Sequence, residues 1–254
     1  MIFYYLSFLI IISLVVYFKS ETISKIINLY DIPDKKRKLH IKPTPLLGGT
    51  IFVIYIFTFT IFSILYDFKI IDNYNQSIIT ISILAFFIIG FVDDKFEINA
   101  YIKLFIQILI SLILIYLIQE NFLIEKLIFK DLDLTISIGK FSLIFTSLCL
   151  VIFLNAYNMY DGMDGQAAIY SIFIFFILLL KGVEYYFNLG LLCFAILFLI
   201  MNLQKKTFLG DNGNFLLSII ISLLIIRGYQ DNLIYVDEIF LIMILPGVDM
   251  LRLF

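Results

Sequence analysis

The stretch FSLIFTSLCLVIFLNAYNMYDGMDG, residues 141–165, joins an apolar run to an island of polar residues. The island contains two amides and two carboxylates, at Asn155, Asn158, Asp161 and Asp164, and a glycine follows each aspartate. Acids and amides are costly in hydrocarbon, so a cluster of them where a membrane span ends favours a functional site. A plain loop is the alternative interpretation, because Asp and Gly are also ordinary turn residues.

The composition of the chain predicts a membrane protein. Of its 254 residues, 62% are hydrophobic and 15% are charged, and the mean hydropathy is +1.05. These values exclude an ordinary soluble domain and predict an all-α, polytopic membrane bundle, since the apolar runs lack the period-two alternation of a membrane β-barrel. A span needs about 20 mostly apolar residues. We therefore expect one domain over residues 1–254 with nine spans, at residues 2–18, 46–66, 77–92, 101–118, 141–157, 166–180, 185–202, 213–227 and 237–253.

The placement of Lys and Arg predicts the topology. The loop 19–45 contains seven basic residues, and cytoplasmic loops are enriched in such residues, so this loop is expected inside and the N-terminus outside. Alternation of the spans puts three further loops inside, near residues 93–100, 158–165 and 203–212. In the outer segment 119–140, polar and apolar residues alternate from Asp131 to Ile138, as in a half-buried strand. We expect a short extracytoplasmic β-hairpin there, with an irregular loop as the alternative.

Four polar clusters fall on the predicted inner side. The first, residues 31–49, combines basic residues with three prolines, two glycines and the only histidine, His40. The second is Asp93-Asp94, followed by Lys103, the third is the island, and the fourth surrounds Asp211. Each has a structural alternative, namely a topogenic basic loop, a helix cap, a snorkelling lysine or a turn before a helix.

The convergence of the clusters carries more weight than any one of them. By the predicted topology, five acids meet near Lys38, His40 and Lys103, namely Asp93, Asp94, Asp161, Asp164 and Asp211. Carboxylate and amide oxygens suit a hard cation such as Mg²⁺, which binds through a few carboxylates and substrate phosphates. Clustered Cys and His ligands for zinc or copper are lacking. Basic side chains suit phosphate oxygens, so the set predicts Mg²⁺-assisted phosphoryl transfer at a membrane surface.

At these residues the chain resembles the polyprenyl-phosphate N-acetylhexosamine-1-phosphate transferases of glycosyltransferase family 4. The matching motifs, in chain order, are Asp31-x-Pro33…Arg37-Lys38-x-His40…Pro45…Gly48-Gly49, Asp93-Asp94 with Lys103-Leu-x-x-Gln107, Asn155-x-x-Asn158-x-x-Asp161-Gly-x-Asp164-Gly, and Phe208-x-Gly210-Asp211. Together they cover most of the chain. The Arg-Lys-x-His loop is more similar to the branch that starts O-antigen, enterobacterial common antigen or teichoic-acid glycans than to the phospho-N-acetylmuramoyl-pentapeptide transferases.

The resemblance implies a multi-pass enzyme of the bacterial plasma (inner) membrane with a cytoplasmic active site. It implies transfer of a sugar-1-phosphate from a UDP-N-acetylhexosamine, expected to be UDP-N-acetylglucosamine, to polyprenyl (undecaprenyl) phosphate, with release of UMP. Mg²⁺, or Mn²⁺ in its place, is assigned to Asn158 and Asp211, and catalysis to Asp93, Asp94 and Asp164. Substrate binding is assigned to Lys38, His40, Lys103, Asn155 and Asp161. The lipid bilayer is a further partner, a homodimer is left open, and no nucleic acid is expected.

The chain also departs from the family's pattern. Gln166 and Tyr170 stand where the family usually has Leu and Gly, and Asn214 and Ser218 replace a common Ser and a common Gly; all four are tolerable changes. Family members continue into a His-rich cytoplasmic loop, whereas this sequence stops at Phe254, so we expect a fragment of a longer protein. Two other interpretations stay open, a transporter and an inactive truncated homologue. Intramembrane acids also mark ion paths, but transporter sites lie near the midplane between repeated halves, and no repeat is visible.

Overall fold

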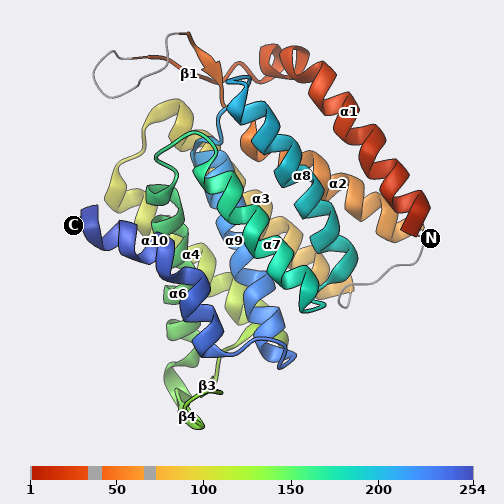
Figure 1. Cartoon of the computed structure of the whole chain (residues 1–254). Coiled ribbons are helices and arrows are strands. Elements are labelled where there is room, and N and C mark those ends of the chain that lie inside the picture. Colours follow the sequence, from red (N-terminus) through yellow and green to blue (C-terminus); the bar gives the residue numbers. More distant parts are fainter. Residues whose placement is uncertain (1, 34–41, 66–72, 254) are drawn as a thin grey trace.

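The computed structural model describes residues 2–33, 42–65 and 73–253, and most of them lie in helices (Figure 1). The helices are α1 (Ile2–Ile27), α2 (Gly48–Leu65), α3 (Asn73–Phe96), α4 (Ala100–Leu117), α5 (Gln119–Phe122), α6 (Ser142–Tyr160), α7 (Gln166–Leu180), α8 (Tyr185–Leu203), α9 (Gly210–Gln230) and α10 (Val236–Leu253). Four short strands form two antiparallel pairs, β1 (Tyr30–Asp31) with β2 (Thr44–Pro45) and β3 (Lys126–Phe129) with β4 (Leu134–Ser137). The predicted helical membrane bundle is confirmed.

Each of the nine expected spans coincides with a helix, but not all of these helices have the length and composition of a span. Among the described residues, seven helices are long and apolar enough to cross a membrane, namely α1, α2, α3, α4, α6, α8 and α9. Helix α7 is apolar but has only 15 residues, and α10 carries four charged residues, Asp237, Glu238, Asp249 and Arg252. The largest boundary error is in α1, which continues to Ile27. The apolar run ends earlier, but Lys and Glu are good helix formers and prolong the helix past it.

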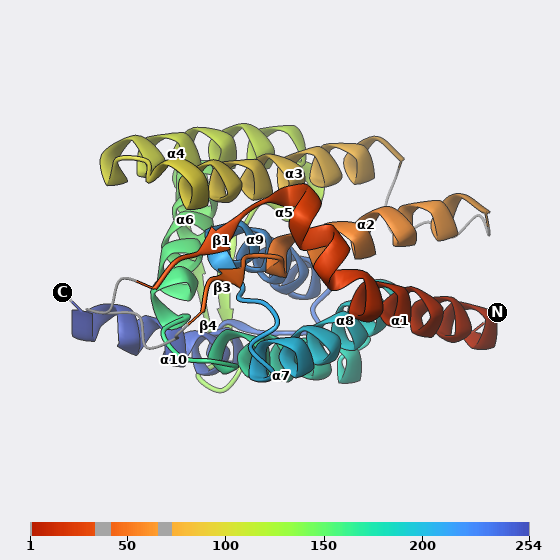
Figure 2. The same cartoon turned by 90° about the horizontal axis from the view of Figure 1, so that it is seen from above.

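Helix α9 is the axis of the bundle, with α2, α3, α6 and α7 packed around it (Figure 2). It is buried along nearly its whole length. Two glycines allow close packing at its start. A β-carbon at Gly48 would lie 2.6 Å from Leu209 Cα, and one at Gly90 would lie 2.6 Å from Asn212 Cα. Small residues let membrane helices approach closely, so the polar start of α9 is held inside the bundle.

The segment before α2 docks on the segment before α9. The Phe208 N–H donates to the carbonyl of Pro45 at 2.9 Å, and the Gly48 N–H donates to the carbonyl of Phe208 at 3.1 Å. The first and fourth sequence clusters therefore meet in space, as the predicted topology requires. Lys38 and His40, the basic residues assigned to this meeting point, lie outside the described residues.

The β3–β4 hairpin lies at the opposite end of the bundle from β1 (Figure 1). It confirms the predicted hairpin, although its first strand starts at Lys126, before the alternating stretch. Residues 127–129 are all apolar, so alternation gave no signal there. The hairpin is tied to the end of α9, because the Tyr229 hydroxyl donates to the carbonyl of Lys126 at 2.7 Å and accepts from the Ile128 N–H at 3.0 Å.

Candidate active site

A cleft of about 790 Å³ opens at the N-terminal end of α9. Its walls come from the segment before α2, the end of α3, the ends of α6 and α8 with the loops that follow them, and the start of α9. Five predicted site residues line it, namely Asp94, Asn158, Asp161, Asp164 and Asp211, and Asp31 of the first motif lines it as well. The predicted convergence of the four clusters at one end of the bundle is therefore confirmed for the residues that the structure describes.

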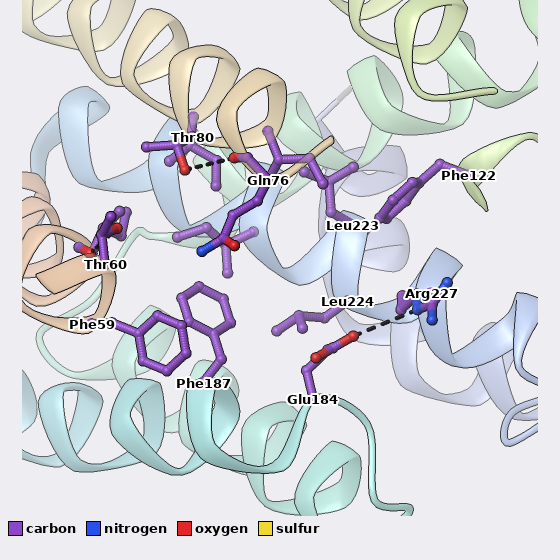
Figure 3. A pocket seen from close by; sticks show the side chains of 14 residues that line it. Phe59, Thr60, Gln76, Thr80, Phe122, Glu184, Phe187, Leu223, Leu224 and Arg227 are labelled. Atoms are coloured by element: carbon purple, nitrogen blue, oxygen red, sulfur yellow. Dashed lines mark hydrogen bonds and ion pairs between the residues drawn. The ribbon is translucent and has the colours of Figure 1, made fainter. Parts of the chain in front are cut away.

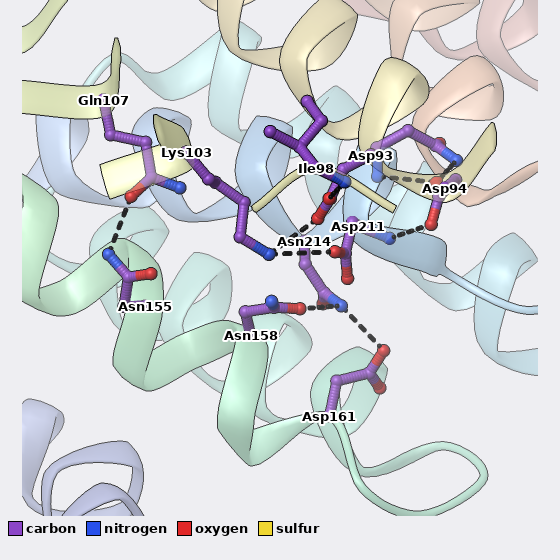
Figure 4. Close-up of polar contacts among 11 residues, drawn as sticks. Asp93, Asp94, Ile98, Lys103, Gln107, Asn155, Asn158, Asp161, Asp211 and Asn214 are labelled. Carbon is purple, nitrogen blue, oxygen red and sulfur yellow. Dashed lines mark hydrogen bonds and ion pairs between the residues drawn. The ribbon is translucent and has the colours of Figure 1, made fainter. Parts of the chain in front are cut away.

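Asp94, near the end of α3, binds the first turn of α9 (Figure 4). Its Oδ1 accepts the Asp211 N–H at 2.9 Å, and its Oδ2 accepts the Asn212 N–H at 3.0 Å. The unpaired N–H groups at a helix start carry partial positive charge, so a carboxylate there stabilises the helix. The structural alternative for this acid was a helix cap. Asp94 does cap a helix, namely α9. Asp94 thereby fixes the direction of Asp211.

Lys103 of α4 links two of the acids. Its Nζ lies 2.6 Å from Asp93 Oδ2 and 3.5 Å from Asp211 Oδ2. Asp93 is buried, and its Oδ1 accepts the Ile98 N–H at 2.9 Å. The ammonium group also lies 5.5 Å from the centroid of the Phe215 ring. Asp93 and Lys103 thus stand behind the cleft rather than in its lining, where the lysine offsets the charge of two carboxylates.

Asn214 joins α9 to the end of α6, and the sequence prediction did not include it among the site residues. Its Nδ2 donates to Asn158 Oδ1 at 3.0 Å and to Asp161 Oδ2 at 3.0 Å (Figure 4). The pKa of Asp161 is raised to about 6, mainly by burial; the hydrogen bond from Asn214 opposes this rise and the charge of Asp164 adds to it. The sequence could have pointed to Asn214 through its spacing, because it follows Asp211 by three residues and therefore lies on the same face of a helix.

Asn155 and Asp164 occupy the margins of the site. The Asn155 Nδ2 donates to Gln107 Oε1 at 2.9 Å and to the carbonyl of Val151 at 2.8 Å, and Asn155 does not line the cleft. Asp164 is half exposed, and its Oδ2 lies 4.0 Å from Lys205 Nζ. The assignments of both residues to substrate and catalysis stay predictions.

Asn202, at the end of α8, is a second cleft residue that the sequence prediction missed. Its Oδ1 accepts the Gly165 N–H at 2.6 Å, and its Nδ2 donates to the carbonyl of Thr207 at 3.0 Å. It therefore joins the loop after α6 to the loop before α9. A single amide at the end of an apolar run gives no sequence signal of such a role.

The oxygen donors of the cleft fit a Mg²⁺ ion that substrate phosphates would complete. In the described part of the chain, no three or more Asp, Glu, His or Cys side chains come close enough together to hold a metal ion by themselves. Mg²⁺ does not require such a group, because it usually binds through one or two carboxylates, water and phosphates. Asp211 and Asn158, the predicted ligands, both line the cleft, and Asn158 Oδ1 already accepts from Asn214.

Comparisons with known proteins identify the family to which the sequence is similar. Residues 76–229, which contain the second, third and fourth clusters, match the sequence profile of glycosyl transferase family 4. A phospho-N-acetylmuramoyl-pentapeptide-transferase of Prochlorococcus marinus (strain MIT 9312) is 31% identical over 214 residues, which are 76% of this chain and 59% of the relative. A protein of the same name from Thermotoga petrophila is 32% identical over 67% of this chain and 56% of the relative.

The matches leave part of each relative uncovered. A third relative of that name, from Thermoanaerobacter sp. (strain X514), is 31% identical over 70% of this chain and 59% of the relative. The chain therefore spans less than two thirds of the length of these relatives. Their name is that of the branch to which the first-loop motif is less similar, so the branch is a separate question from the family.

Proposed function

The chain belongs to glycosyl transferase family 4, and we propose that it transfers a sugar-1-phosphate from a nucleotide sugar to a polyprenyl phosphate. The observation that carries the proposal is the position of the cleft, where carboxylates and amides from three helices surround the start of a helix buried in the bundle. A membrane lipid and a water-soluble diphosphate can both reach such a place. Phosphoryl transfer needs mainly positioning and charge neutralisation, which this set of side chains is suited to provide.

In the proposed reaction, an oxygen of the lipid phosphate attacks the phosphorus that carries the sugar. The bond from that phosphorus to the bridging oxygen breaks, and UMP leaves with the bridging oxygen. Asp211 and Asn158 would hold Mg²⁺, which would neutralise charge on the diphosphate. Asp94 aims Asp211 through the first turn of α9, and Asp93 holds Lys103 beside it. Asp94 is the one of these two acids that lines the cleft, and it would take the proton of the lipid phosphate.

Two donor sugars compete within this function. The Arg37-Lys38-x-His40 motif supports UDP-N-acetylglucosamine, which is our proposed donor. The printed names of the relatives support a phospho-N-acetylmuramoyl-pentapeptide donor instead. Assays with each UDP-linked donor at equal concentration separate the two. A kcat/KM at least tenfold higher for the acetylglucosamine donor supports the first, and the reverse ratio supports the second.

The test of the function itself is UMP release from a radiolabelled UDP-sugar by the purified protein in lipid nanodiscs. The expected result is release that requires both polyprenyl phosphate and Mg²⁺ and that stops with a chelator. Release without polyprenyl phosphate would instead indicate hydrolysis. No release, together with ion or solute flux in proteoliposomes, would support the transporter.

We also propose that the cleft faces the cytoplasm, on the basis of the basic residues in the loop 19–45. Single cysteines at Lys42 and at Asp131, in a background without Cys149 and Cys193, test this orientation. Both positions are exposed, and they lie toward opposite ends of the bundle. An impermeant thiol reagent on intact cells should label position 131 and not position 42. The opposite pattern would contradict the orientation.

A further inference from the structure

We propose that a groove between α1 and α8 binds one acyl chain of an anionic phospholipid and that Lys206 binds the phosphate of this lipid. The α1–α8 groove is separate from the cleft described above, since the two share no lining residue. The occupant is a lipid of the surrounding membrane, neither donor nor acceptor of the proposed reaction. The inference therefore goes beyond the proposed function and does not depend on it.

Helix α1 lies at the edge of the bundle beside α8 (Figure 1) and is tied to the neighbourhood of α8 at two levels. At the first level the Tyr5 hydroxyl donates to the carbonyl of Tyr186 at 2.8 Å. At the second, the Tyr17 hydroxyl donates to Gln204 Oε1 at 3.0 Å. Between these two levels the helices leave a groove of about 550 Å³ with an almost entirely apolar lining. Hydrogen bonds thus hold the groove at each end and leave its middle to apolar contacts.

The length and lining of the α1–α8 groove suit an acyl chain. Its α1 side runs from Leu6 to Phe18, which is about 18 Å at 1.5 Å per residue. One leaflet of a bilayer contributes about half of the hydrocarbon core, or about 15 Å. Ile10 and Leu14 line the groove and are exposed, so the groove is open to the surrounding hydrocarbon. Apolar cavities stay dry and accept apolar guests, so a lipid chain is the natural occupant.

Lys206 marks the headgroup level of the α1–α8 groove. Its Nζ lies 3.8 Å from the centroid of the Tyr17 ring, and Tyr17 lines the end of the groove. Lys206 is exposed, and its ammonium group forms no ion pair with an acid of the described part of the chain. Lysines at membrane interfaces pack their stems on apolar surface and hold their charge at the level of the headgroups. An ammonium group there is a suitable partner for a phosphate oxygen.

The surrounding charge favours an anionic lipid over a zwitterionic one. Beyond the groove, α1 exposes two lysines and one acid, at Lys19, Glu21 and Lys25. The neighbouring Lys205 lies 4.0 Å from Asp164, whereas Lys206 has no such partner among the described residues. A lysine near a membrane surface strengthens the binding of anionic lipid roughly fivefold. A zwitterionic lipid carries its own cation beside the phosphate and gains less.

A purely structural role for Lys206 is the alternative, because a cation over an aromatic ring stabilises the contact between two segments. Lys95, at the same end of the bundle, offers a matched case. Its Nζ lies 5.4 Å from the centroid of the Phe96 ring and it is exposed, but neither residue lines the α1–α8 groove. If Lys206 only holds α1 in place, its charge has no effect on which lipid occupies the groove. If it binds a phosphate, the lipid preference depends on its charge and not on that of Lys95.

The test uses the absence of tryptophan from this chain. Leu14→Trp places one fluorophore in the groove, and Val15→Trp places one on the next residue of the same helix, outside the groove. The two native side chains are equally exposed, at 51% and 54%. The proteins are placed in nanodiscs of mixed phosphatidylcholine and phosphatidylglycerol, with brominated chains on one lipid or the other as the quencher. We expect brominated phosphatidylglycerol to quench Leu14→Trp with roughly fivefold higher relative affinity than brominated phosphatidylcholine, and Val15→Trp to show a ratio within about twofold of one.

Two lysine variants in the Leu14→Trp protein then assign the preference. Lys206→Gln keeps the length of the side chain and removes its charge, so the ratio should fall to about one. Lys95→Gln should leave the ratio unchanged. Because the larger side chain at position 14 could itself displace the lipid, Ile10→Trp repeats the comparison from a second groove position with an exposed native side chain.

Each other outcome overturns the inference. Equal ratios at the groove positions and at position 15, or a preference that survives Lys206→Gln, would exclude the anionic lipid site. Quenching at position 15 but not at positions 10 and 14 would show that protein, such as a second copy of the chain, covers the groove. Unbrominated polyprenyl phosphate should relieve the quenching by brominated phosphatidylglycerol no better than unbrominated phosphatidylglycerol does. Stronger relief would make the groove part of the acceptor site instead.

Discussion

The two ends of helix α9 use similar residue types for different purposes. At the start, Asp211 and Asn214 join α3, α4 and α6 and face a cleft of about 790 Å³. At the other end, Arg227 Nε lies 3.5 Å from Glu184 Oε1 and 3.2 Å from Asp231 Oδ2, beside a cavity of only about 70 Å³ (Figure 3). Phe59, Phe122 and Phe187 line much of that small cavity.

Both ends match the helix dipole, since N–H groups at the start of α9 donate to the carboxylate of Asp94 and the last turn carries the cationic Arg227. The difference lies in what the polar groups leave open. At the end of α9, the guanidinium group of Arg227 lies between two carboxylates and offsets their charge, as expected for a structural site. At the start, five carboxylates line one cleft, which suits a cationic or donor-dependent ligand. The comparison teaches that a cluster of charged residues does not by itself identify the candidate active site. Carboxylates without matching positive charge, beside a large cleft, do identify it.

The largest expected effect is on activity, from the same substitution at each end of α9. Asp211→Asn keeps the shape of the side chain and removes its charge, so lipid- and Mg²⁺-dependent UMP release should fall by roughly 10²–10³-fold, the range for loss of one electrostatic contact in a site. Asp231→Asn should leave UMP release within about twofold. Initial rates on purified proteins with equal helix content by circular dichroism make the comparison. Wild-type activity in Asp211→Asn would remove the proposed metal site.

The next effect is on stability at the start of α9. Asp94→Ala leaves the N–H groups of Asp211 and Asn212 without their acceptor in the buried first turn, so the free energy of unfolding should fall by about 3 kcal/mol. Asp164→Ala, an exposed acid of the same cleft, is the control and should change it by less than about 0.5 kcal/mol. Thermal unfolding in detergent measures both. Equal melting temperatures for the two variants would show that Asp94 does not cap α9.

Apolar runs and charge placement predict much of this fold. The helices form where about 20 apolar residues follow one another, and the loop with most basic residues places three other clusters on its own side of the membrane. The acids of the site were found because acids are rare at the edge of a span. The contacts between helices could not be predicted in this way. That Asp94 caps α9 rather than its own helix, and that Asn214 reaches Asp161, depend on which helices are neighbours in the bundle, and hydrophobic periodicity does not contain that information.

A pH effect should come from the other end of α9. Burial is the main cause that raises the pKa of Glu184 from 4.5 to about 7. The charge of Arg227 lowers it, and that of Asp231 raises it. Between these pH values the folded state binds more protons than the unfolded state, so the free energy of unfolding falls as the pH rises from about 4.5 to 7. The fall is on the order of 2 kcal/mol.

Melting temperatures from pH 4.5 to 8 measure this effect, with Glu184→Gln as the control. The wild type should lose more stability across the range than the variant does. Asp161 has a raised pKa of about 6 and titrates in both proteins, so the difference between the two curves isolates Glu184. Parallel curves would show that Glu184 does not titrate in this window.

The smallest expected effects come from an exposed ion pair at each end of the bundle. The Lys205 Nζ lies 4.0 Å from Asp164 Oδ2 beside the cleft, and the Lys181 Nζ lies 2.6 Å from Glu238 Oε1 at the other end. Exposed pairs of this kind contribute less than about 1 kcal/mol, so Asp164→Asn and Glu238→Gln should both change stability by about 0.5 kcal/mol or less.

Substitutions in the two ion pairs should differ in their effect on catalysis and not in their effect on stability. If Asp164 contacts the nucleotide sugar or the reacting groups, Asp164→Asn changes kcat or KM although it barely changes stability, whereas Glu238→Gln changes neither. Steady-state UMP release alongside melting curves gives both numbers for each variant. A Glu238→Gln variant with altered kcat would couple the far end of the bundle to the chemistry. An Asp164→Asn variant with unchanged kinetics would restrict the site to Asp211 and its neighbours on α3, α4 and α6. Stability alone cannot separate these cases, because at an exposed ion pair solvent screens the charge whether or not a substrate uses it.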